Sequence, residues 1–358
     1  MTIDIRSTGA PKQKPDDAAP LSFGVYTTDH MLVMEWTREQ GWGQPSVIPY
    51  GDLSLDPAAL TLHYGQAVFD GFKAFATADG GAALFRPDAY MARLNQSARR
   101  LDMPELPVGT TLAAVERFVD LERGWIPTRP DSALYLRPTM IATEPHIGVK
   151  SSDRFLFFVI ASPVGAYYAE GFSAVKIKVE DEFVRAAPGG LGAAKTPANY
   201  AASLLAGRRA KSEGYAQVLW LDAVERRWVE EVGSMNIFFR IAGKVITPPL
   251  TGSILPGVTR QCVIEMLAAD GVAVQERRID IEEVISAHED GMLQEVFGSG
   301  TAAVISSVGL LHYRGKDYPI GDGTGGELAS KLFRQITGIQ YGRDEDRFGW
   351  LAKVPRVE

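Results

Sequence analysis

The sequence is poor in the residues that build disulfides and metal sites. It contains one cysteine, Cys262, and five histidines among 358 residues. A single cysteine cannot form an intrachain disulfide, and its place in an apolar helical pattern indicates a buried structural thiol. No two histidines have the spacing of a zinc-binding helix, so we expect no metal site.

Long apolar runs and an excess of positive charge are also absent. No run is long enough to span a membrane, and residues 1–20 are polar and proline-rich without the apolar core of a signal peptide. With 37 basic and 44 acidic residues the formal net charge is −7, which argues against a nucleic-acid or membrane surface but leaves room for a local basic pocket. We expect a cytoplasmic protein.

The common nucleotide and hydrolase motifs are missing too, namely the P-loop, the Gly-x-Gly-x-x-Gly turn after a strand and the Gly-x-Ser-x-Gly elbow. Two other segments could bind an anion. Pro256-Gly257 precedes a helical pattern and would place the N–H groups of Val258 and Thr259 at a helix N-terminus. The segment 298–301 offers a second group of backbone donors and a hydroxyl. Either segment alone is also typical of an ordinary turn.

What is present is a mixture of strand and helix patterns in a chain long enough for two domains. We expect a disordered tail at 1–20, a small α/β domain at 21–163, an interdomain loop at 164–172 and a larger domain at 173–358. Apolar spacing predicts a strand over 132–142 and helices over 88–101, 110–123, 199–213 and 258–270. Because strands and helices do not alternate strictly, the fold class should be α+β with mixed or antiparallel sheets.

One lysine is distinguished by its neighbours. Lys195 follows a glycine-rich stretch and precedes the helical pattern that starts near Asn199, with no acidic residue within ten positions on either side. Small apolar surroundings disfavour a charged ammonium, and a Schiff-base lysine needs its neutral amine. The alternative interpretation is a solvated lysine in a surface loop.

Seven motifs in a fixed order carry a resemblance to a known family. They are 63–75 (HYGQAVFDGFKAF), 85–93 (FRPDAYMAR), 135–138 (YLRP), 195–200 (KTPANY), 231–236 (EVGSMN), 255–260 (LPGVTR) and 297–302 (FGSGTA). Over about 23–350 the chain resembles the branched-chain amino-acid aminotransferases, which are pyridoxal-phosphate (PLP) enzymes of fold type IV. The resemblance implies a two-domain fold in which 173–358 is the PLP-binding domain.

The resemblance implies cofactor-binding roles for several residues. Lys195 would form the internal aldimine with PLP and then move the proton between the α-carbon and the cofactor. Glu231 would pair with the pyridine nitrogen, and Tyr200 would bond to the 3-oxygen. The phosphate would be held by a donor set comprising Arg93, the amides of Val258 and Thr259, and Thr301. Ser234 would add a hydroxyl to the cofactor site.

It also implies a reaction, a substrate site and a partner. The reaction would be ping-pong transamination of leucine, isoleucine and valine with 2-oxoglutarate, giving branched-chain 2-oxo acids and L-glutamate. The backbone of Thr301 and Ala302 would meet the substrate carboxylate, and Arg137 the side-chain carboxylate of glutamate. A homodimer is expected, because the family builds its pocket from two chains. The pocket side chains would be Tyr64, Phe69 and Tyr135, with Ile147 and Val149 contributed by the partner subunit.

The chain departs from the family in a few positions. Thr196-Pro197-Ala198 replaces the usual residues between the lysine and Asn199-Tyr200, and proline restricts both its own φ and the residue before it. Asp70 stands for a usual glutamate, and Ser234 for a usual threonine. The Cys-x-x-Cys of the mammalian mitochondrial enzymes is absent, so we expect no redox control of that kind.

Two alternatives stay open at this point. One is another activity of the same fold, a D-amino-acid aminotransferase or an aminodeoxychorismate lyase, although the Tyr135-x-Arg137 and Glu231-Val232-Gly233 motifs favour the branched-chain branch. The other is a non-catalytic PLP-binding relative, for which the altered lysine loop is the only support.

Overall fold

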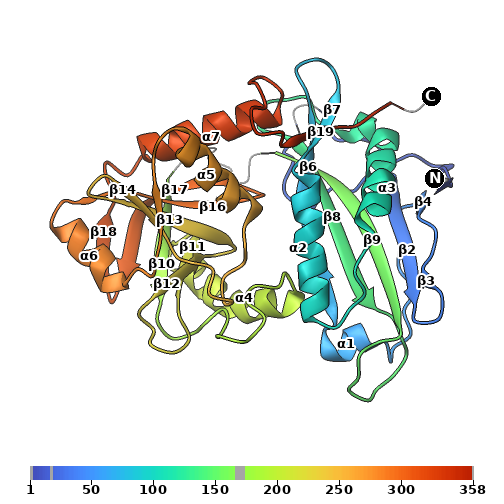
Figure 1. Ribbon diagram of the computed structural model, residues 1–358, viewed down its shortest axis with the longest axis horizontal. Helices are drawn as coiled ribbons and strands as arrows, with labels where there is room; N and C mark the ends of the chain where they lie inside the picture. Colours follow the sequence, from blue (N-terminus) through green and yellow to red (C-terminus); the bar gives the residue numbers. More distant parts are fainter. Residues whose placement is uncertain (1–2, 17–18, 166–173, 357–358) are drawn as a thin grey trace. The chain divides into compact units, whose positions relative to one another are not determined.

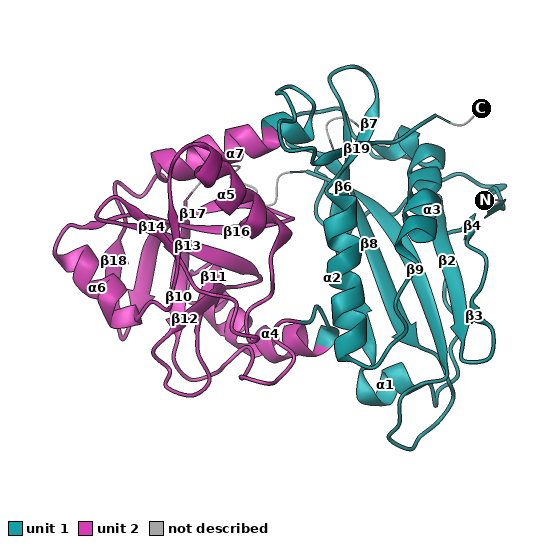
Figure 2. Ribbon diagram, in the orientation of Figure 1, with its two compact units in different colours: residues 1–167, 194–197, 338–358 teal, residues 168–193, 198–337 magenta. Residues whose placement is uncertain are grey.

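The computed structural model describes residues 3–16, 19–165 and 174–356, and the chain divides into two compact units (Figures 1 and 2). Unit 1 comprises residues 1–167, 194–197 and 338–358, and unit 2 comprises residues 168–193 and 198–337. Within the described ranges, no helix has the length and apolar character needed to cross a membrane.

Unit 1 is built on a ten-stranded sheet in the order β1-β4-β2-β9-β8-β6-β7-β19, with β3 beside β2 and β5 beside β8. The β1–β4 pairing is parallel, and the neighbouring pairs along the rest of the sheet are antiparallel. The strands are β1 Asp4–Ile5, β2 His30–Thr37, β3 Gly41–Trp42, β4 Ser46–Pro49, β5 Ala67–Phe69, β6 Phe72–Ala76, β7 Ala82–Phe85, β8 Ala133–Ala142, β9 Arg154–Val164 and β19 Leu351–Lys353.

Helices lie against this sheet and carry part of the candidate site. They are α1 Leu60–Tyr64, α2 Pro87–Arg100, α3 Val108–Leu121 and the 3-10 turn η1 Arg123–Trp125. Helix α2 begins with Pro87, where the missing N–H of proline costs nothing, and buries Met91, Leu94 and Ala98 at helical spacing. Figure 1 shows α2 and α3 side by side, and they contact β5 and β2 respectively.

Unit 2 is built on a nine-stranded sheet in the order β12-β11-β10-β17-β16-β13-β14-β15, with β18 beside β17. Strand β12 pairs with both β11 and β13, so the path from β12 through β17 to β13 closes on itself. The pairs β10–β11, β10–β17 and β14–β15 are parallel. The strands are β10 Val175–Glu180, β11 Gln217–Leu221, β12 Val229–Val232, β13 Met235–Ile241, β14 Lys244–Thr247, β15 Val274–Glu276, β16 Leu293–Gly300, β17 Val304–Tyr313 and β18 Lys316–Pro319.

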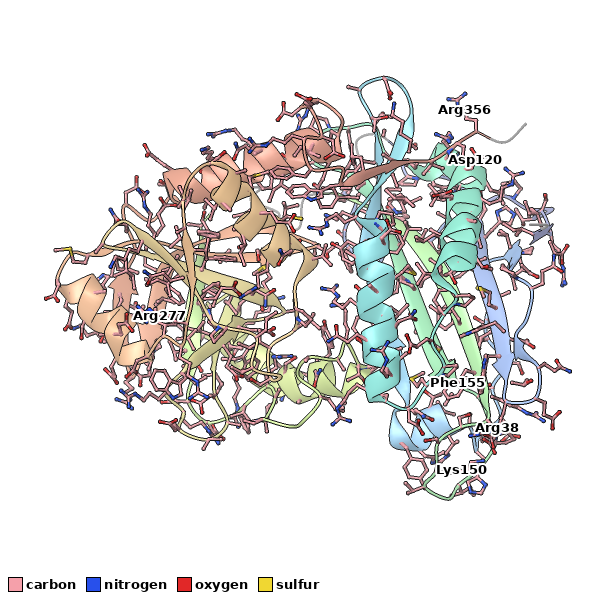
Figure 3. The ribbon with its side chains drawn as sticks, in the orientation of Figure 1. Arg38, Asp120, Lys150, Phe155, Arg277 and Arg356 are labelled. Atoms are coloured by element: carbon pink, nitrogen blue, oxygen red, sulfur yellow. The ribbon has the colours of Figure 1, made fainter. Side chains whose placement is uncertain are left out.

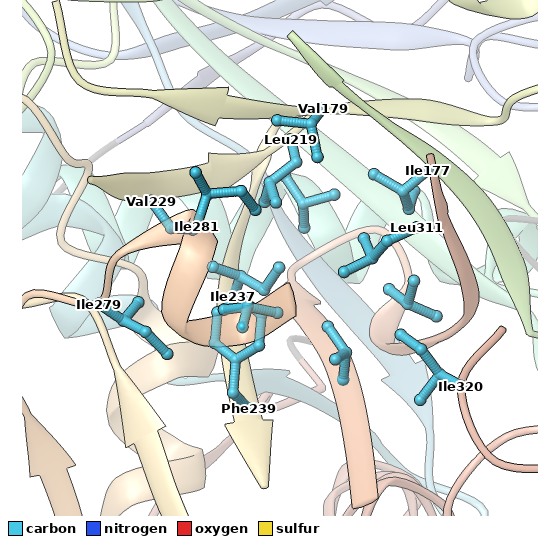
Figure 4. Packing of buried hydrophobic residues seen from close by; sticks show 14 of the residues in the cluster. Ile177, Val179, Leu219, Val229, Ile237, Phe239, Ile279, Ile281, Leu311 and Ile320 are labelled. Atoms are coloured by element: carbon cyan, nitrogen blue, oxygen red, sulfur yellow. The ribbon is translucent and has the colours of Figure 1, made fainter. Parts of the chain in front are cut away.

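The core of unit 2 lies among these strands and helix α6. Figure 4 shows aliphatic side chains from β10, β11, β13 and β17 meeting Ile281 at the start of α6, together with Phe239. Asp280 caps that helix by accepting a hydrogen bond from the Glu282 amide at 3.0 Å. The helices that belong mainly to unit 2 are α4 Pro197–Ser212, α5 Val258–Ala269, α6 Ile281–Glu289 and α7 Glu327–Gln340.

The observed boundaries differ from the predicted ones at both ends of the chain. The described part of the predicted disordered tail is ordered, because β1 pairs with β4 and the Lys12 ammonium binds the Thr27 hydroxyl at 2.6 Å and lies over the Tyr50 ring. Residues 338–358 were expected in the C-terminal domain but belong to unit 1, where β19 extends the sheet beside β7. Most of the predicted interdomain loop, residues 166–172, lies outside the described residues.

The glycine-rich segment after Phe297 also differs from its prediction. We expected Gly298 and Gly300 to interrupt the chain as a donor nest, but β16 runs through Gly300 and pairs with β13 and β17. A Cβ at either glycine would lie 3.0 Å or less from the Met235 side chain, so glycine is needed for packing here. The turn therefore starts at Thr301, one residue after the strand ends.

Candidate active site

The backbone of Lys195 is fixed to strand β5 and helix α2 of unit 1. Its N–H donates to Ser97 Oγ at 2.9 Å, and its carbonyl accepts from the Phe69 N–H at 3.0 Å. The next residue, Thr196, is fully buried and donates its hydroxyl to the Ala67 carbonyl at 2.8 Å. Pro197 then occupies the first position of α4, where proline is favourable. Thr196 and Pro197, which depart from the family motif, thus hold the start of α4 in place.

The side chain of Lys195 faces an aromatic ring that a guanidinium also contacts. Its Nζ lies 5.2 Å from the centre of the Phe69 ring, and the Arg137 guanidinium lies 4.9 Å from the same centre. Arg137 donates to the Tyr135 hydroxyl through Nη2 at 3.1 Å and Nε at 3.3 Å. Gly71 makes room for this phenol, because a Cβ there would lie 1.7 Å from the Tyr135 oxygen. The structure therefore brings four predicted site residues together.

Arg93 is held beside this group by a carboxylate. Its Nε and Nη2 donate to the two oxygens of Asp70 at 2.9 and 2.6 Å, and both side chains are buried. The Ser97 hydroxyl donates to the Arg93 carbonyl at 2.9 Å, and Ser97 Oγ also accepts the Lys195 N–H. Asp70 was noted in the sequence only as a replacement of glutamate, and its role as the partner of Arg93 was missed.

Three further predicted residues lie on the exposed side of unit 1. Tyr64, Ile147 and Val149 are 43%, 71% and 83% exposed, and the Tyr64 hydroxyl donates to the Ile147 carbonyl. Their loop is held by Lys150, which binds Glu144 at 2.8 Å and Asp153 at 3.1 Å (Figure 3). Their exposure makes these apolar side chains available to another surface.

Within unit 2, Glu231 is buried beside an arginine that the sequence reading missed. Glu231 Oε2 lies 2.8 Å from Arg185 Nε, and its Oε1 accepts the Leu255 N–H at 2.7 Å. The Arg185 guanidinium also donates to the carbonyls of Gly192, at 3.3 Å, and Ser253. Arg185 thus joins the predicted ring-binding acid to the glycine-rich stretch before Lys195 and to the loop before α5.

A second carboxyl adjoins this network. Glu230 is 5% exposed and accepts a hydrogen bond from the Ser253 hydroxyl, while its Oε2 has no hydrogen-bond partner. Burial raises the pKa of Glu230, and the Ser253 hydrogen bond and the nearby Arg185 charge oppose that shift only in part. Successive residues of a strand point to opposite faces, so the side chains of Glu230 and Glu231 lie on opposite faces of β12.

The start of helix α5 offers the backbone donors expected for an anion. Gly257 is the N-cap and provides no side-chain cap, so the first N–H groups, at Val258 and Thr259, have no intrahelical acceptor. The Asn236 side chain fixes the segment before α5 by donating to the Leu255 carbonyl at 2.9 Å. A Cβ at Gly257 would lie 1.9 Å from Asn236 Oδ1, so only glycine fits at this position.

The remaining predicted residues lie at turns and at one helix of unit 2. Ser234 is exposed in the turn between β12 and β13, and Thr301 and Ala302 form the turn after β16. These two turns are neighbours, because Gly300 packs against Met235, the residue after Ser234. Tyr200 lies in the first turns of α4 and is half-buried.

Lys73 is a buried lysine on β6, opposite Tyr135. Burial lowers its pKa from 10.5 to about 8, and the charge of Asp131 opposes this only in part. The sequence reading gave Lys73 no role. It is the natural comparison for Lys195 in any test of lysine chemistry.

Comparison with known proteins assigns the chain to a family. The model of class IV amino-transferases matches residues 67–309. Branched-chain-amino-acid aminotransferase 2 of Bacillus subtilis (strain 168) is 51% identical over 354 residues, covering 99% of this chain and 97% of the relative. The branched-chain-amino-acid aminotransferase of Mycolicibacterium smegmatis is 45% identical over 337 residues, covering 93% and 92%. The chain therefore belongs to the class IV aminotransferase family.

Solved structures agree with this placement. The branched-chain amino acid aminotransferase of Escherichia coli matches with a TM-score of 0.75 and 27% identity, covering 90% of this chain and 99% of that one. The branched-chain aminotransferase of the archaeon Thermoproteus uzoniensis, solved with norvaline, has a TM-score of 0.76 and 25% identity over 91% and 100%. The resemblance drawn from the seven motifs is confirmed, and so are the fold class, fold type IV of α+β type, and the assignment to the transferases.

The family also defines the cofactor and the kind of substrate. Class IV aminotransferases are PLP enzymes that act on amino and oxo acids. One solved branched-chain aminotransferase that matches this chain, with a TM-score of 0.75 and 27% identity, holds pyridoxamine 5'-phosphate. Pyridoxamine phosphate is the amino form of PLP, so that structure represents one half of a transamination cycle.

Proposed function

We propose that this chain transfers the amino group of leucine, isoleucine and valine to 2-oxoglutarate with PLP as cofactor, alternating between amino-acid and oxo-acid substrates. The observation that carries the proposal is the placement of Lys195. Two hydrogen bonds hold its backbone, the Thr196 hydroxyl anchors the next residue, and its amine faces Phe69 beside Arg137. The identity of about half to curated branched-chain aminotransferases supports the choice of substrates.

The donor set of the chain fits PLP. The phosphate is a dianion, and Arg93 together with the open N-terminus of α5 supplies a guanidinium and backbone N–H groups. Gly257 lets the Asn236 amide pack against that helix end, because a Cβ there would lie 1.9 Å from Asn236 Oδ1. In our proposal Thr301 adds a hydroxyl at the phosphate, and Tyr200 and Ser234 contact the ring edge. When bound, PLP supplies the electron sink that stabilises negative charge at the substrate α-carbon.

Lys195, Glu231 and Arg185 have different roles in the proposed reaction. The amine of Lys195 would hold the cofactor and, as a free amine, would accept and return the α-proton as general base and acid. The Glu231 carboxylate would keep the proton on the pyridine nitrogen. Arg185 orients Glu231, since its Nε lies 2.8 Å from Oε2 while Oε1 accepts the Leu255 N–H.

Arg137 accounts for the use of apolar and acidic substrates in one pocket. Its Nε and Nη2 donate to the Tyr135 hydroxyl, and its Cζ lies 4.9 and 5.2 Å from the centres of the Phe69 and Tyr135 rings. The rings present an apolar wall to a branched side chain. The remaining guanidinium N–H groups would donate to the side-chain carboxylate of glutamate, and the backbone at Thr301 and Ala302 would meet the α-carboxylate.

We propose a homodimer in which the exposed side chains of Ile147 and Val149 complete the partner's substrate pocket, with Tyr64 at the same surface. Their exposed fractions, 71% and 83%, are costly for apolar side chains that stay in water. Sedimentation of the purified protein tests the dimer, and a monomer with full activity would exclude this part of the proposal.

Reduction of the holoenzyme with borohydride tests the lysine. We expect stable attachment of the cofactor to Lys195 and none to Lys73, as read by peptide mass spectrometry. The Lys195→Ala variant should lose at least ~10²–10⁴ in kcat, the usual contribution of a positioned acid–base group. Labelling of Lys73 alone, or failure of the protein to take up PLP, would refute the proposed chemistry.

A substrate panel separates the activities of the fold. We expect L-leucine, L-isoleucine and L-valine to convert the cofactor to its amino form, with 2-oxoglutarate reversing the change. Faster turnover of D-alanine or aminodeoxychorismate would move the chain to another branch of the family. A PLP-binding protein with no spectral change on any amino acid would be a non-catalytic relative.

A further inference from the structure

Unit 1 contains a cavity of about 440 Å³ that is rich in arginine. It lies by the turn between β6 and β7, and its walls come from residues far apart in the sequence. Four arginines line it, against one acidic side chain, Asp131; the arginines are Arg123, Arg129, Arg343 and Arg356. A chain with an overall charge of −7 therefore concentrates positive charge at one hollow of its surface.

Arg123 shapes the wall of the cavity. It binds Asp120 through Nε at 3.2 Å and donates from Nη2 to the Val354 carbonyl at 3.0 Å. These bonds attach the segment after β19, which carries Arg356, to the end of α3, and Figure 3 shows Asp120 and Arg356 at the same end of unit 1. The charge of Arg123 is compensated by Asp120, so its contribution is to position the cavity wall.

Arg343 and Arg356 supply positive charge that the protein does not neutralise by ion pairing. Among the residues that the structure describes, neither has an ion-pair partner, and both are exposed. The Arg343 guanidinium lies 5.0 Å from the centre of the Tyr341 ring, a cation–π contact that holds it over the cavity without cancelling its charge. Two guanidinium groups with available donors are well matched to a carboxylate or phosphate.

The floor of the cavity is apolar and fixed. Tyr341 donates its hydroxyl to the Ser132 carbonyl at 2.9 Å and meets Phe75 edge-to-face at 5.2 Å between ring centres. The Tyr341 carbonyl accepts the Ala78 N–H at 3.0 Å, which joins the floor to the β6–β7 turn. Ile126, which is buried, extends the apolar lining. An apolar floor with charged groups at the rim suits a ligand with two different ends.

We propose that this cavity is a binding site for a small organic anion, with its carboxylate or phosphate head at Arg343 and Arg356 and its apolar body against Tyr341 and Ile126. The volume lies within the ~300–1,000 Å³ typical of small-molecule sites. The site involves none of the residues assigned to cofactor or substrate, and it stands whether or not the proposed transamination is correct.

Calorimetric titration of the PLP-saturated enzyme tests the site with three probes: phenyl phosphate, benzoate and inorganic phosphate. We expect saturable binding of about one phenyl phosphate per chain, tighter than inorganic phosphate because of the apolar floor. The double variant Arg343→Gln/Arg356→Gln should weaken phenyl phosphate at least tenfold. The control Arg278→Gln/Arg314→Gln also removes two exposed positive charges, but in unit 2, and should leave binding unchanged.

Comparison of benzoate with phenyl phosphate identifies which anionic head the arginines favour. A crystal soaked with phenyl phosphate should show its phosphate at Arg343 and Arg356 and its ring against Tyr341 and Ile126. The proposal is overturned if no saturable binding occurs, if both double variants weaken it equally, or if the probe occupies only the cofactor and substrate site. Equal affinity for inorganic and phenyl phosphate would overturn the apolar half of the site.

Discussion

Each unit buries one arginine–carboxylate pair at the residues proposed to hold the cofactor. The arginine and the acid exchange roles between the two pairs. In unit 1 the arginine, Arg93, is the proposed ligand group and Asp70 supports it; in unit 2 the acid, Glu231, is the proposed ligand group and Arg185 supports it. A lone buried charge is costly, so each charge that must face a ligand is given an opposite charge behind it. Orientation and charge are thus established within each unit by its own residues.

The pairs differ in how completely they are enclosed. Asp70 is fully buried, gives both oxygens to Arg93, and also accepts the Gly71 N–H at 2.7 Å. Glu231 divides its oxygens between Arg185 and the Leu255 N–H. The first is a closed pair and the second is part of a network. Loss of a partner should therefore cost more in unit 1 than in unit 2.

The largest effect is expected for Asp70→Asn. The variant leaves the charged Arg93 guanidinium buried against a neutral amide. The NH2 group of that amide would face an Arg93 N–H group, so two donors would meet without an acceptor. Breaking a buried pair in this way should lower the free energy of unfolding of the apo-enzyme by about 3–5 kcal/mol, measured by urea denaturation. PLP affinity should fall as well, because the phosphate loses an oriented arginine.

Glu105→Gln is the matched control for Asp70→Asn. Glu105 forms a comparable two-point pair with Arg99, through bonds of 3.0 and 2.7 Å, but on the surface. Its loss should leave the urea midpoint unchanged, since solvent screens exposed pairs. If Asp70→Asn is no more harmful than Glu105→Gln, the closed pair does not have the importance assigned to it.

Arg185→Gln should have the next largest effect. It removes a cation from Glu231 and donors from the Gly192 and Ser253 carbonyls, but Glu231 keeps the Leu255 N–H. We expect a loss of about 2–3 kcal/mol in the unfolding free energy, as for hydrogen bonds to charged groups, together with weaker PLP binding. Equilibrium dialysis of PLP and urea denaturation measure the two effects.

The control for Arg185→Gln is Arg240→Gln, in the same unit. Arg240 binds Glu295 at 3.0 Å and is about one-third exposed, and Glu295 keeps two backbone N–H donors, from Leu328 and Ala329. This variant should leave PLP affinity intact. Equal loss of PLP affinity in both variants would mean that Arg185 acts only through general stability.

A third change tests the arginine that serves the substrate. Arg137→Met keeps an unbranched side chain against Phe69 but removes the donors. We expect KM for 2-oxoglutarate to rise ~30-fold, equivalent to about 2 kcal/mol for a hydrogen-bonded charge, while the half-reaction with L-leucine changes less than about threefold. Single-turnover spectra with each substrate separate the two, and equal loss with both would show that Arg137 supports the pocket as a whole.

The sequence contained enough to predict the ligand-facing residues but not their supports. Lys195 stands in a local pattern of glycines, small residues and a helix start, and that pattern survives in the structure as a pinned backbone. Asp70 and Arg185 acquire their roles from partners far away in the chain, Arg93 and Glu231. No local spacing distinguishes such residues from surface charges, so only the folded chain identifies them.

The fold shows the same limit. Long periodic segments such as α2 and β8 were predicted to within two residues at each end, because their apolar faces are repeated over several turns or alternations. The short strands β1 and β19 at the two edges of the sheet, and β7 beside β19, have too few residues to show a period. Gly298 was read as loop because glycine favours turns, but the space beside Met235 decides its place in β16.

The smallest expected effect is a pH dependence at the network of unit 2, which includes a second buried carboxyl, Glu230. Its pKa is raised by burial, so the proton is bound more tightly in the folded than in the unfolded chain. The resulting stabilisation is complete below the ordinary pKa of glutamate and is lost as the pH rises through the raised value. Glu230→Gln is uncharged throughout, so its unfolding free energy relative to wild type should increase as the pH rises over this interval, by less than ~1.5 kcal/mol, about the net contribution of one hydrogen bond. Urea midpoints of both apo-enzymes from pH 4 to pH 8 measure the trend, and parallel curves would show that Glu230 titrates normally.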